Sequence, residues 1–173
     1  FILIGGLAVA VIKIFRIDFY FGFSKKGLAV GLKKYALPGI IAGICSFAAF
    51  YIGLQPFNYQ PTIWKIFIEG IIYYIGVGII EEFYVRGLFL NIVEAVCSNR
   101  SHKTVTAIIV SSVVFGLGHI PGVISMGVGV IAFKVVSTIG MGLYFGMIYK
   151  KTNNLWIPIM IHIFINICAL PYC

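Results

Sequence analysis

Charged residues are scarce in this sequence, and acidic residues are the scarcest of all. Only 10% of the 173 residues are charged, with five Asp or Glu against 13 Lys or Arg. A soluble domain usually carries roughly 25% charged residues. Here 61% of the residues are hydrophobic, and the core of one 173-residue domain could not bury them all. Many of them must therefore face lipid. The composition therefore excludes a soluble globular protein.

Metal-binding motifs and processing signals are absent from the sequence as well. The cysteines show no metal spacing, and we interpret them as small apolar residues within helices (Cys45, Cys97, Cys168 and Cys173). No internal repeat or low-complexity linker divides the chain, which predicts one domain over residues 1–173. The chain begins at Phe1 without the basic start or cleavage site of a signal peptide, so we expect an upstream segment before it.

Long apolar runs make up most of the remaining sequence. About six of them are present, over residues 1–12, 36–54, 64–96, 104–119, 123–149 and 155–170. Because a bilayer core needs roughly 20 helical residues, we predict an all-α, polytopic transmembrane helical bundle of about six helices. The run 64–96 is too long for a straight crossing, so it should tilt, kink at Gly76 and Gly78, or continue along the interface.

Glycine is frequent within these runs, with 20 in the whole chain. Near-repeats occur at Gly127 and Gly129, and at Gly140, Gly142 and Gly146. Small residues let helices approach closely in lipid, where no hydrophobic force drives them together. We therefore interpret these glycines as helix-packing positions and not as a phosphate-binding loop.

Basic residues occupy every second connector between the apolar runs. The cations of the first, third and fifth connectors are Lys13, Arg16, Lys25, Lys26, Lys33, Lys34, Arg100, Lys103, Lys150 and Lys151. The second and fourth connectors carry no cation. By the positive-inside rule, the odd connectors are cytoplasmic. The same placement explains the net charge of +8 through membrane topology and argues against a nucleic-acid partner.

The run 64–96 contains ionisable residues, which are costly within a bilayer. A charged side chain at mid-membrane costs at least about 2.5 kcal/mol and usually marks function. On a helix, Glu82 and Arg86 share a face and can neutralise each other. Glu81 points about 100° away and has no partner nearby in sequence, which suits a general base. Alternatively, all three form an ion network that only holds helices together.

Two histidines and an asparagine lie in later apolar runs. His119 follows Phe115 by four residues at the end of the fourth run. His162 and Asn166 are also four residues apart, so they project from one face of the sixth run. Each of these residues could instead hydrogen-bond a neighbouring helix without any catalytic role. No motif surrounds two further ionisable residues, to which we assign no role (Glu69 and Lys134).

Depth in the membrane indicates that the polar residues could meet. Counted from the cytoplasmic connectors, Glu81 and His119 each lie about 16 residues into their helices, and His162 and Asn166 about 9 and 13. At about 1.5 Å per residue, all four lie roughly 13–24 Å from the cytoplasmic end. Three separate helices therefore deliver polar groups to a similar level, which favours a shared site over four independent structural contacts.

These residues form an ordered set of three short motifs. The motifs are EExxxR (Glu81, Glu82, Arg86), FxxxH (Phe115, His119) and HxxxN (His162, Asn166). The set resembles the CPBP family of intramembrane proteases, which comprises CAAX prenyl-protein endopeptidases and the bacterial Abi or bacteriocin-processing proteins. The stretch LYFGMIYKKTNNLWIPIMIHIFIN is similar to the last family motif. The resemblance covers about residues 70–170 and implies a catalytic core at about 64–170.

The resemblance implies an endopeptidase with specific residue roles. Glu81 would activate a water molecule together with His119. His162 and Asn166 would bind the oxyanion of the tetrahedral intermediate. The supporting positions would be Glu82, Arg86 and Phe115.

The family has been classed as metalloproteases, so zinc is one option for the mechanism. Zinc normally takes three His, Cys or carboxylate ligands, which Glu81, His119 and His162 could supply. However, the sequence contains no HExxH spacing, and Asn166 is a poor zinc ligand but a good oxyanion donor. We therefore expect that no cofactor is required, with zinc as the alternative.

Two other functions use the same kinds of residues. An ion-coupled transporter also places Glu, His and Lys in the membrane, but it usually shows internal repeats, which this sequence lacks. A non-catalytic bacteriocin-immunity or scaffold protein is the other alternative, which the family resemblance allows. For the protease we expect a peptide or membrane-protein substrate in a bacterial cell membrane, reached from the cytoplasmic side. The sequence does not indicate the natural substrate or the oligomeric state.

Overall fold

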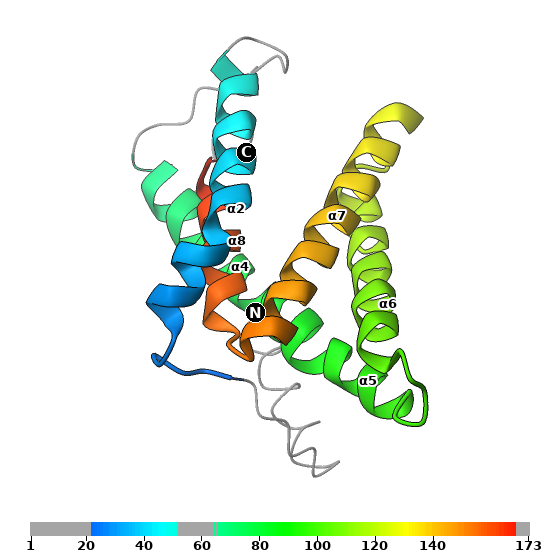
Figure 1. Ribbon diagram of the computed structural model, residues 1–173. Helices are drawn as coiled ribbons and strands as arrows, with labels where there is room; N and C mark the ends of the chain where they lie inside the picture. Colours follow the sequence, from blue (N-terminus) through cyan, green and yellow to red (C-terminus); the bar gives the residue numbers. More distant parts are fainter. Residues whose placement is uncertain (1–21, 52–63, 65, 169–173) are drawn as a thin grey trace. The chain divides into compact units, whose positions relative to one another are not determined.

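The computed structural model describes residues 22–51, 64 and 66–168 (Figure 1). Its elements are α2 (Leu28–Tyr51), η1 (Ile66–Ile71), α4 (Ile72–Glu82), η2 (Phe83–Leu90), α5 (Asn91–Val96), α6 (Lys103–Leu117), η3 (Ile120–Gly122), α7 (Val128–Thr152) and α8 (Trp156–Cys168). Across the described residues these elements form five helical runs and no strand, which confirms an all-α fold with one run fewer than expected. The expected first segment, residues 1–12, lies outside the described residues.

Two helices extend further into the basic connectors than the apolar pattern predicted. α2 begins at Leu28, not near residue 36, and therefore includes Lys33 and Lys34. α7 likewise continues to Thr152, through the expected fifth connector. Lysine is a good helix former, and its long stem lets the ammonium group reach water from inside a helix. Hydropathy therefore placed these helix ends wrongly.

The expected segment 64–96 is a continuous helical run from Ile66 to Val96 with two π-helical stretches. A kink at Gly76 and Gly78 was one expected outcome. Both glycines lie inside the regular helix α4. The departures from α-helical geometry are instead η1 and η2, on either side of α4. Because a π-helical turn contains an extra residue, side-chain faces predicted from a four-residue spacing do not continue through η2.

The described residues form two compact units. One contains α2, η1, α4 and α8; we call it the α8 unit. The other contains the remaining described helices, from η2 to α7; we call it the α7 unit. The boundary in the long helical run falls between α4 and η2. That residues 1–173 form one domain stays a prediction.

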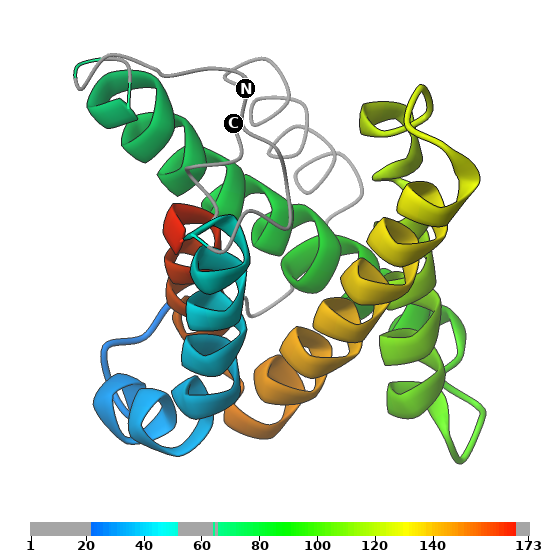
Figure 2. The same ribbon diagram turned by 90° about the horizontal axis from the view of Figure 1, so that it is seen from above.

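In the α7 unit, α6 and α7 run side by side and antiparallel (Figures 1 and 2). Glycines of α7 allow this contact: a Cβ at Gly142 would lie 2.8 Å from Cβ of Ser112, and one at Gly146 would lie 3.1 Å from Cγ2 of Ile108. The predicted packing role is confirmed at these two positions. For three others no described neighbour lies within 4 Å of such a Cβ, so their packing role stays a prediction (Gly127, Gly129 and Gly140).

In the α8 unit, α2 and α4 both pack against α8. A Cβ at Gly39 would lie 2.2 Å from Cγ2 of Ile161, and one at Gly43 would lie 2.8 Å from Cε1 of Phe164. Only glycine fits such short distances, because the backbone of α2 lies against the side chains of α8. The α2 glycines therefore fix the side of α2 that faces α8.

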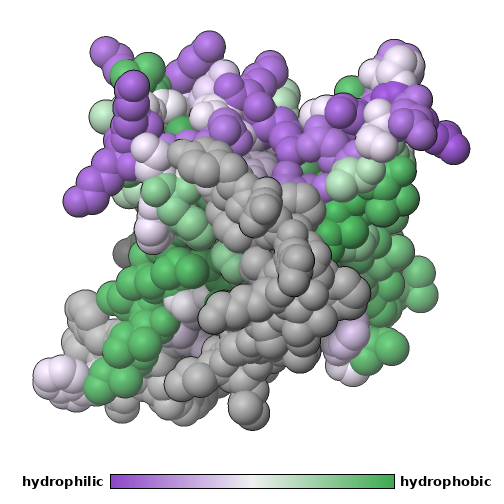
Figure 3. Space-filling view, turned by 90° about the horizontal axis from the view of Figure 1, so that it is seen from below, coloured by the Kyte–Doolittle hydropathy of each residue, from purple (hydrophilic) through white to green (hydrophobic). Residues whose placement is uncertain are grey.

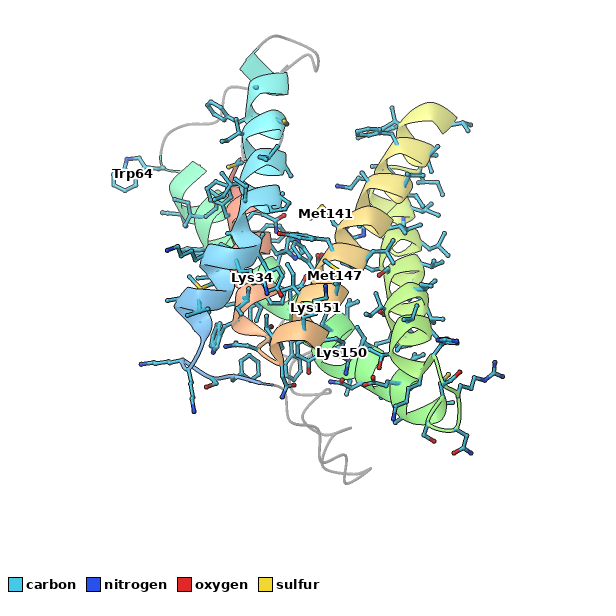
Figure 4. The ribbon with its side chains drawn as sticks, in the orientation of Figure 1. Lys34, Trp64, Met141, Met147, Lys150 and Lys151 are labelled. Carbon is cyan, nitrogen blue, oxygen red and sulfur yellow. The ribbon has the colours of Figure 1, made fainter. Side chains whose placement is uncertain are left out.

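A polar network joins α5, α6 and α7 at one end of the α7 unit, where α7 carries Lys150 (Figure 4). The ammonium group of Lys150 donates to Oδ1 of Asn91 at 2.6 Å and to Oε2 of Glu94 at 2.5 Å. Asn91 Nδ2 donates to the hydroxyl of Tyr149 at 2.9 Å, and Thr104 donates to the other oxygen of Glu94. Buried polar groups are costly when unpaired, so this network fixes how the helix ends meet.

We predict that Asn91→Leu destabilises the α7 unit. The change keeps the side-chain size but removes the partner of the buried Tyr149 hydroxyl and one partner of Lys150, which should cost about 1–3 kcal/mol. Thermal unfolding in detergent, followed by circular dichroism, measures the loss. The control is Ser137→Ala, which removes an exposed hydroxyl bonded only to its own helix. Equal melting temperatures for Asn91→Leu and the wild type would show that the network contributes nothing.

The surface of the described residues is strongly apolar, and hydrophobic residues cover broad areas of it in Figure 3. Large apolar side chains such as Val30, Phe133 and Val128 are 73%, 74% and 82% exposed. Among the described helices, three are long and apolar enough to cross a membrane, over Leu28–Cys45, Lys103–Gly122 and Val128–Thr152. Exposed apolar surface of this extent requires lipid as the solvent. The chain is an integral membrane protein.

Candidate active site

Glu81, Glu82 and His162 meet in the α8 unit. The two glutamates are the last residues of α4, and His162 lies in the middle of α8. The helices approach closely near Gly78, one turn before Glu82, where a Cβ would lie 2.7 Å from Cγ1 of Ile163. The glycine therefore allows the C-terminal end of α4 to place its carboxylates beside the imidazole of His162.

The imidazole of His162 contacts both carboxylates, one through each nitrogen. Its Nδ1 donates a hydrogen bond to Oε1 of Glu82 at 2.8 Å. Its Nε2 lies 3.6 Å from Oε2 of Glu81, slightly beyond hydrogen-bond distance. The side chains of Glu82 and His162 are 0% and 4% exposed, whereas that of Glu81 is 30% exposed. A buried carboxylate thus orients the histidine, and a more accessible carboxylate faces its other nitrogen.

This arrangement separates an orienting group from the groups that could act on a substrate. A carboxylate that accepts from Nδ1 fixes the ring orientation and leaves Nε2 as the atom that faces Glu81. Nε2 and Glu81 are 3.6 Å apart, close enough for one oxygen atom of water or a substrate that lies beside them to contact both groups. The trio can therefore hold and polarise an oxygen atom, as a hydrolase requires.

Asn166 lies one turn beyond His162 on α8 and is half-buried. α8 is a regular α-helix over both residues, so they lie on the same face of it. The backbone therefore agrees with the placement predicted from HxxxN. The role of Asn166 at the oxyanion stays a prediction.

We predict that Gly78→Leu abolishes most of the activity, whereas Gly76→Leu does not. A side chain at Gly78 would collide with Ile163 of α8 and push the carboxylates away from His162. A Cβ at Gly76 has no described neighbour within 4 Å, so the same substitution there tests only the cost of adding a leucine to α4. Peptide-cleavage rates for the two purified variants give the comparison. Similar rates would show that the close approach of α4 and α8 does not matter.

His119 and Phe115 lie in the α7 unit. The sequence placed His119 at the end of the fourth apolar run. α6 ends earlier, at Leu117, so His119 lies in the turn that follows the helix. Its Nδ1 donates to the backbone oxygen of Phe115 at 2.8 Å, and the two rings are packed edge to face with centroids 4.8 Å apart. Because a carbonyl oxygen only accepts, Nε2 of the neutral ring is left as an acceptor. Phe115 therefore orients His119.

Arg86 is fully buried on η2, with its guanidinium group against two aromatic rings. Its Cζ lies 4.4 Å from the ring centroid of Phe115 and 5.4 Å from that of Phe145. Arginine is attracted to aromatic faces at such distances. Arg86 thus supports the residue that orients His119. The sequence predicted Arg86 and Phe115 as supporting residues but not Phe145, because a phenylalanine in an apolar helix carries no distinguishing signal.

The structure brings the predicted residues together in two groups. The group in the α8 unit is Glu81, Glu82 and His162, and that in the α7 unit is Arg86, Phe115 and His119. That both groups share one cavity, and that Glu82 pairs with Arg86, stay predictions. Sequence reasoning missed the Glu82–His162 contact, since no local pattern links residues 80 positions apart.

The ligand set for zinc is incomplete among the residues that the structure describes. No three His, Cys, Asp or Glu side chains in that part of the chain are grouped so that they could hold a metal ion. His162 Nε2 and Glu81 Oε2 are two donors on neighbouring helices, and a catalytic zinc site takes three from the protein. The third expected ligand, His119, belongs to the α7 unit. The zinc alternative stays a prediction.

Comparison with known proteins gives the family. The profile described as "Type II CAAX prenyl endopeptidase Rce1-like" matches residues 62–168, which include all three motifs. Neither a curated protein nor a solved structure matches the chain. The matched region includes the glutamates of α4 and the histidines of both units. The chain therefore belongs to the Rce1-like family, and it is an intramembrane endopeptidase of the general CAAX type.

Proposed function

We propose that the chain hydrolyses a peptide bond of a membrane-associated substrate, with Glu81 as the general base. The observation that carries the proposal is the position of His162 between Glu81 and the buried Glu82. Glu81 is the accessible carboxylate of the pair and sits at the end of α4, where a water molecule could bind against it. A carboxylate within hydrogen-bond reach of water can take its proton as the water attacks the carbonyl carbon.

The tetrahedral intermediate would carry its negative charge near His162. Glu82 accepts from Nδ1, so a ring that also holds a proton on Nε2 could donate it to the oxyanion while the carboxylate of Glu82 balances the charge of the ring. Asn166, on the same face of α8, would donate a second hydrogen bond from its side-chain amide. His119 would assist Glu81 in activating water. The hydrogen bond from His119 Nδ1 to the backbone oxygen of Phe115 leaves Nε2 of His119 as an acceptor, which supports that role.

The proposed mechanism requires no metal ion, because the sequence has no HExxH spacing and Asn166 is a poor zinc ligand but a good oxyanion donor. We predict that a chelator such as phenanthroline, after dialysis, leaves the rate of the reconstituted protein unchanged. The control is a zincin protease treated in the same way, which must lose its activity. Loss of cleavage that added zinc restores would replace the metal-free mechanism with a metalloprotease mechanism.

The substrate class follows from the family. A type II CAAX prenyl endopeptidase acts on a prenylated carboxyl-terminal motif, so we propose a lipid-anchored peptide as the substrate. Bacteriocin processing, reached from the cytoplasmic side of a bacterial membrane, is the alternative that we propose, and its substrate would be an unmodified hydrophobic peptide. Purified protein in liposomes should cleave a farnesylated CAAX peptide, and mass spectrometry of the products identifies the bond. Cleavage of neither the farnesylated nor an unmodified hydrophobic peptide would reject the proposal.

A further inference from the structure

α2 carries lysines and apolar side chains on one exposed face. The face consists of Val30, Lys33, Lys34, Leu37, Ile41 and Ile44, all of which are exposed. Their spacing follows the helical repeat, so they form a stripe along α2. Lys34 of this stripe is labelled on α2 in Figure 4. We call the stripe the lysine-headed face of α2, because its cations lie in the first turns and only apolar residues follow them.

The opposite side of α2 is already occupied within the α8 unit. Gly39 and Gly43 lie against Ile161 and Phe164 of α8 at distances that admit no side chain. These glycines lie well away from the stripe around the helix. The lysine-headed face is therefore not the surface by which α2 packs onto α8, and it faces the surroundings of the α8 unit.

The charge around this face is of one sign. Residues 22–51 contain four lysines and no Asp or Glu. Lys25, in the turn just before α2, adds an exposed cation to Lys33 and Lys34 of the stripe. All three lie at one end of the candidate span Leu28–Cys45. Lysine ammonium groups bind phosphate as compact point charges, so an occupant with an anionic phosphate group complements this end.

The length of the apolar part matches one leaflet. From Lys34 to Ile44 the helix rises by about 15 Å at 1.5 Å per residue. The hydrocarbon core of a bilayer is about 30 Å thick, so one leaflet accounts for about half of it. An acyl chain that begins at the level of the lysines would therefore run along Leu37, Ile41 and Ile44. A free phosphate ion has no acyl chain and would make no favourable contact with these three side chains.

We propose that the lysine-headed face of α2 binds an anionic phospholipid. Its phosphate group contacts Lys25, Lys33 and Lys34, and its acyl chains lie along Leu37, Ile41 and Ile44. A zwitterionic lipid of the same chain length binds more weakly, because its own cationic headgroup repels the lysines. This lipid site lies on α2 and does not depend on the proposed peptidase activity.

The test compares two lipids on the purified protein. Native mass spectrometry in detergent, with equal amounts of phosphatidylglycerol and phosphatidylcholine, measures the ratio of the two lipids retained. We expect the wild type to retain phosphatidylglycerol preferentially by about tenfold or more. Each lysine near a membrane surface contributes roughly a fivefold preference. The triple variant Lys25→Gln, Lys33→Gln, Lys34→Gln should therefore retain the two lipids about equally.

Matched variants separate this site from general charge. A control variant removes the same charge from exposed positions of the α7 unit and should keep the preference for phosphatidylglycerol. Its substitutions are Arg100→Gln, Lys103→Gln and Lys151→Gln. The triple Lys→Arg variant at the α2 positions should keep it too, and inorganic phosphate should not displace the lipid. Equal retention by the wild type, an unchanged preference in the Gln variant, or the same loss in the α7-unit variant would each overturn the proposal.

A second measurement covers the case in which the Gln variant does not fold. The wild type is then examined over a range of salt concentrations, because salt screens exposed charges. The preference for phosphatidylglycerol should fall as salt rises. A preference that is independent of salt would overturn a site built on exposed lysines.

Discussion

Glu81→Gln should lower the rate of peptide cleavage by about a hundredfold to ten-thousandfold, the range associated with loss of a general acid or base. Gln has the size of Glu but cannot take a proton from water. The effect should fall on kcat, because Glu81 acts on the attacking water and not on the distant parts of the substrate. Purified wild type and variant, reconstituted at equal protein-to-lipid ratio, give the two rates by chromatography of a fluorescent prenylated peptide.

The matched control for this change is Glu94→Gln. Glu94 is bound to Lys150 and Thr104 in the α7 unit, away from the carboxylates of α4 in the sequence and outside the proposed chemistry. Its replacement removes the same charge and should leave turnover per folded molecule close to that of the wild type. Turnover of Glu81→Gln at the rate of the control would remove Glu81 from the mechanism.

Glu82→Gln should lower kcat by about a thousandfold with little change in KM. The buried carboxylate of Glu82 accepts the hydrogen bond from His162 Nδ1 and balances the charge of a ring that holds a proton on both nitrogens, whereas the neutral amide of glutamine cannot balance that charge. In a serine protease, the equivalent change of an orienting carboxylate costs about ten-thousandfold. Loss of that charge would leave substrate binding intact but weaken the hydrogen bond that Nε2 donates to the oxyanion.

Glu82→Asp distinguishes this role from a purely structural one. Aspartate keeps the charge and accepts from the same nitrogen, although at a longer reach, so it should recover part of the activity lost in Glu82→Gln. Thermal unfolding of both variants shows whether each is folded. If Glu82→Asp is as inactive as Glu82→Gln while both remain folded, the orientation of His162 by a carboxylate is not what the reaction needs.

Much of the fold could be predicted from hydropathy because lipid sets a simple length rule. Five of the expected apolar segments correspond to helical runs in the described residues. Helix ends were less predictable, as α2 shows: its lysines belong to the helix although hydropathy placed them in a connector. The π-helical stretches beside α4 were not predictable at all, since the sequence carries no periodic signal for them.

The candidate site was predictable as a set of residues but not as a set of contacts. Polar residues inside apolar helices are costly, so Glu81, His119 and His162 stand out in the sequence. Their partners depend on which faces meet. The sequence suggested Arg86 as a partner of Glu82 but gave no sign of His162, which the structure places on Glu82. The sequence also could not show which glycines lie at a helix contact. Gly142 packs against α6, but Gly140 has no described neighbour beside it.

Cleavage in water labelled with heavy oxygen tests the proposed hydrolysis most directly. Reconstituted wild-type protein and the Glu81→Gln variant are incubated with a prenylated peptide in labelled water, and the products are analysed by mass spectrometry. A water molecule activated by Glu81 predicts one heavy oxygen in the new carboxyl group of the wild-type product and almost no product from the variant. Labelled product formed equally fast by Glu81→Gln, or product without the label, would contradict that chemistry.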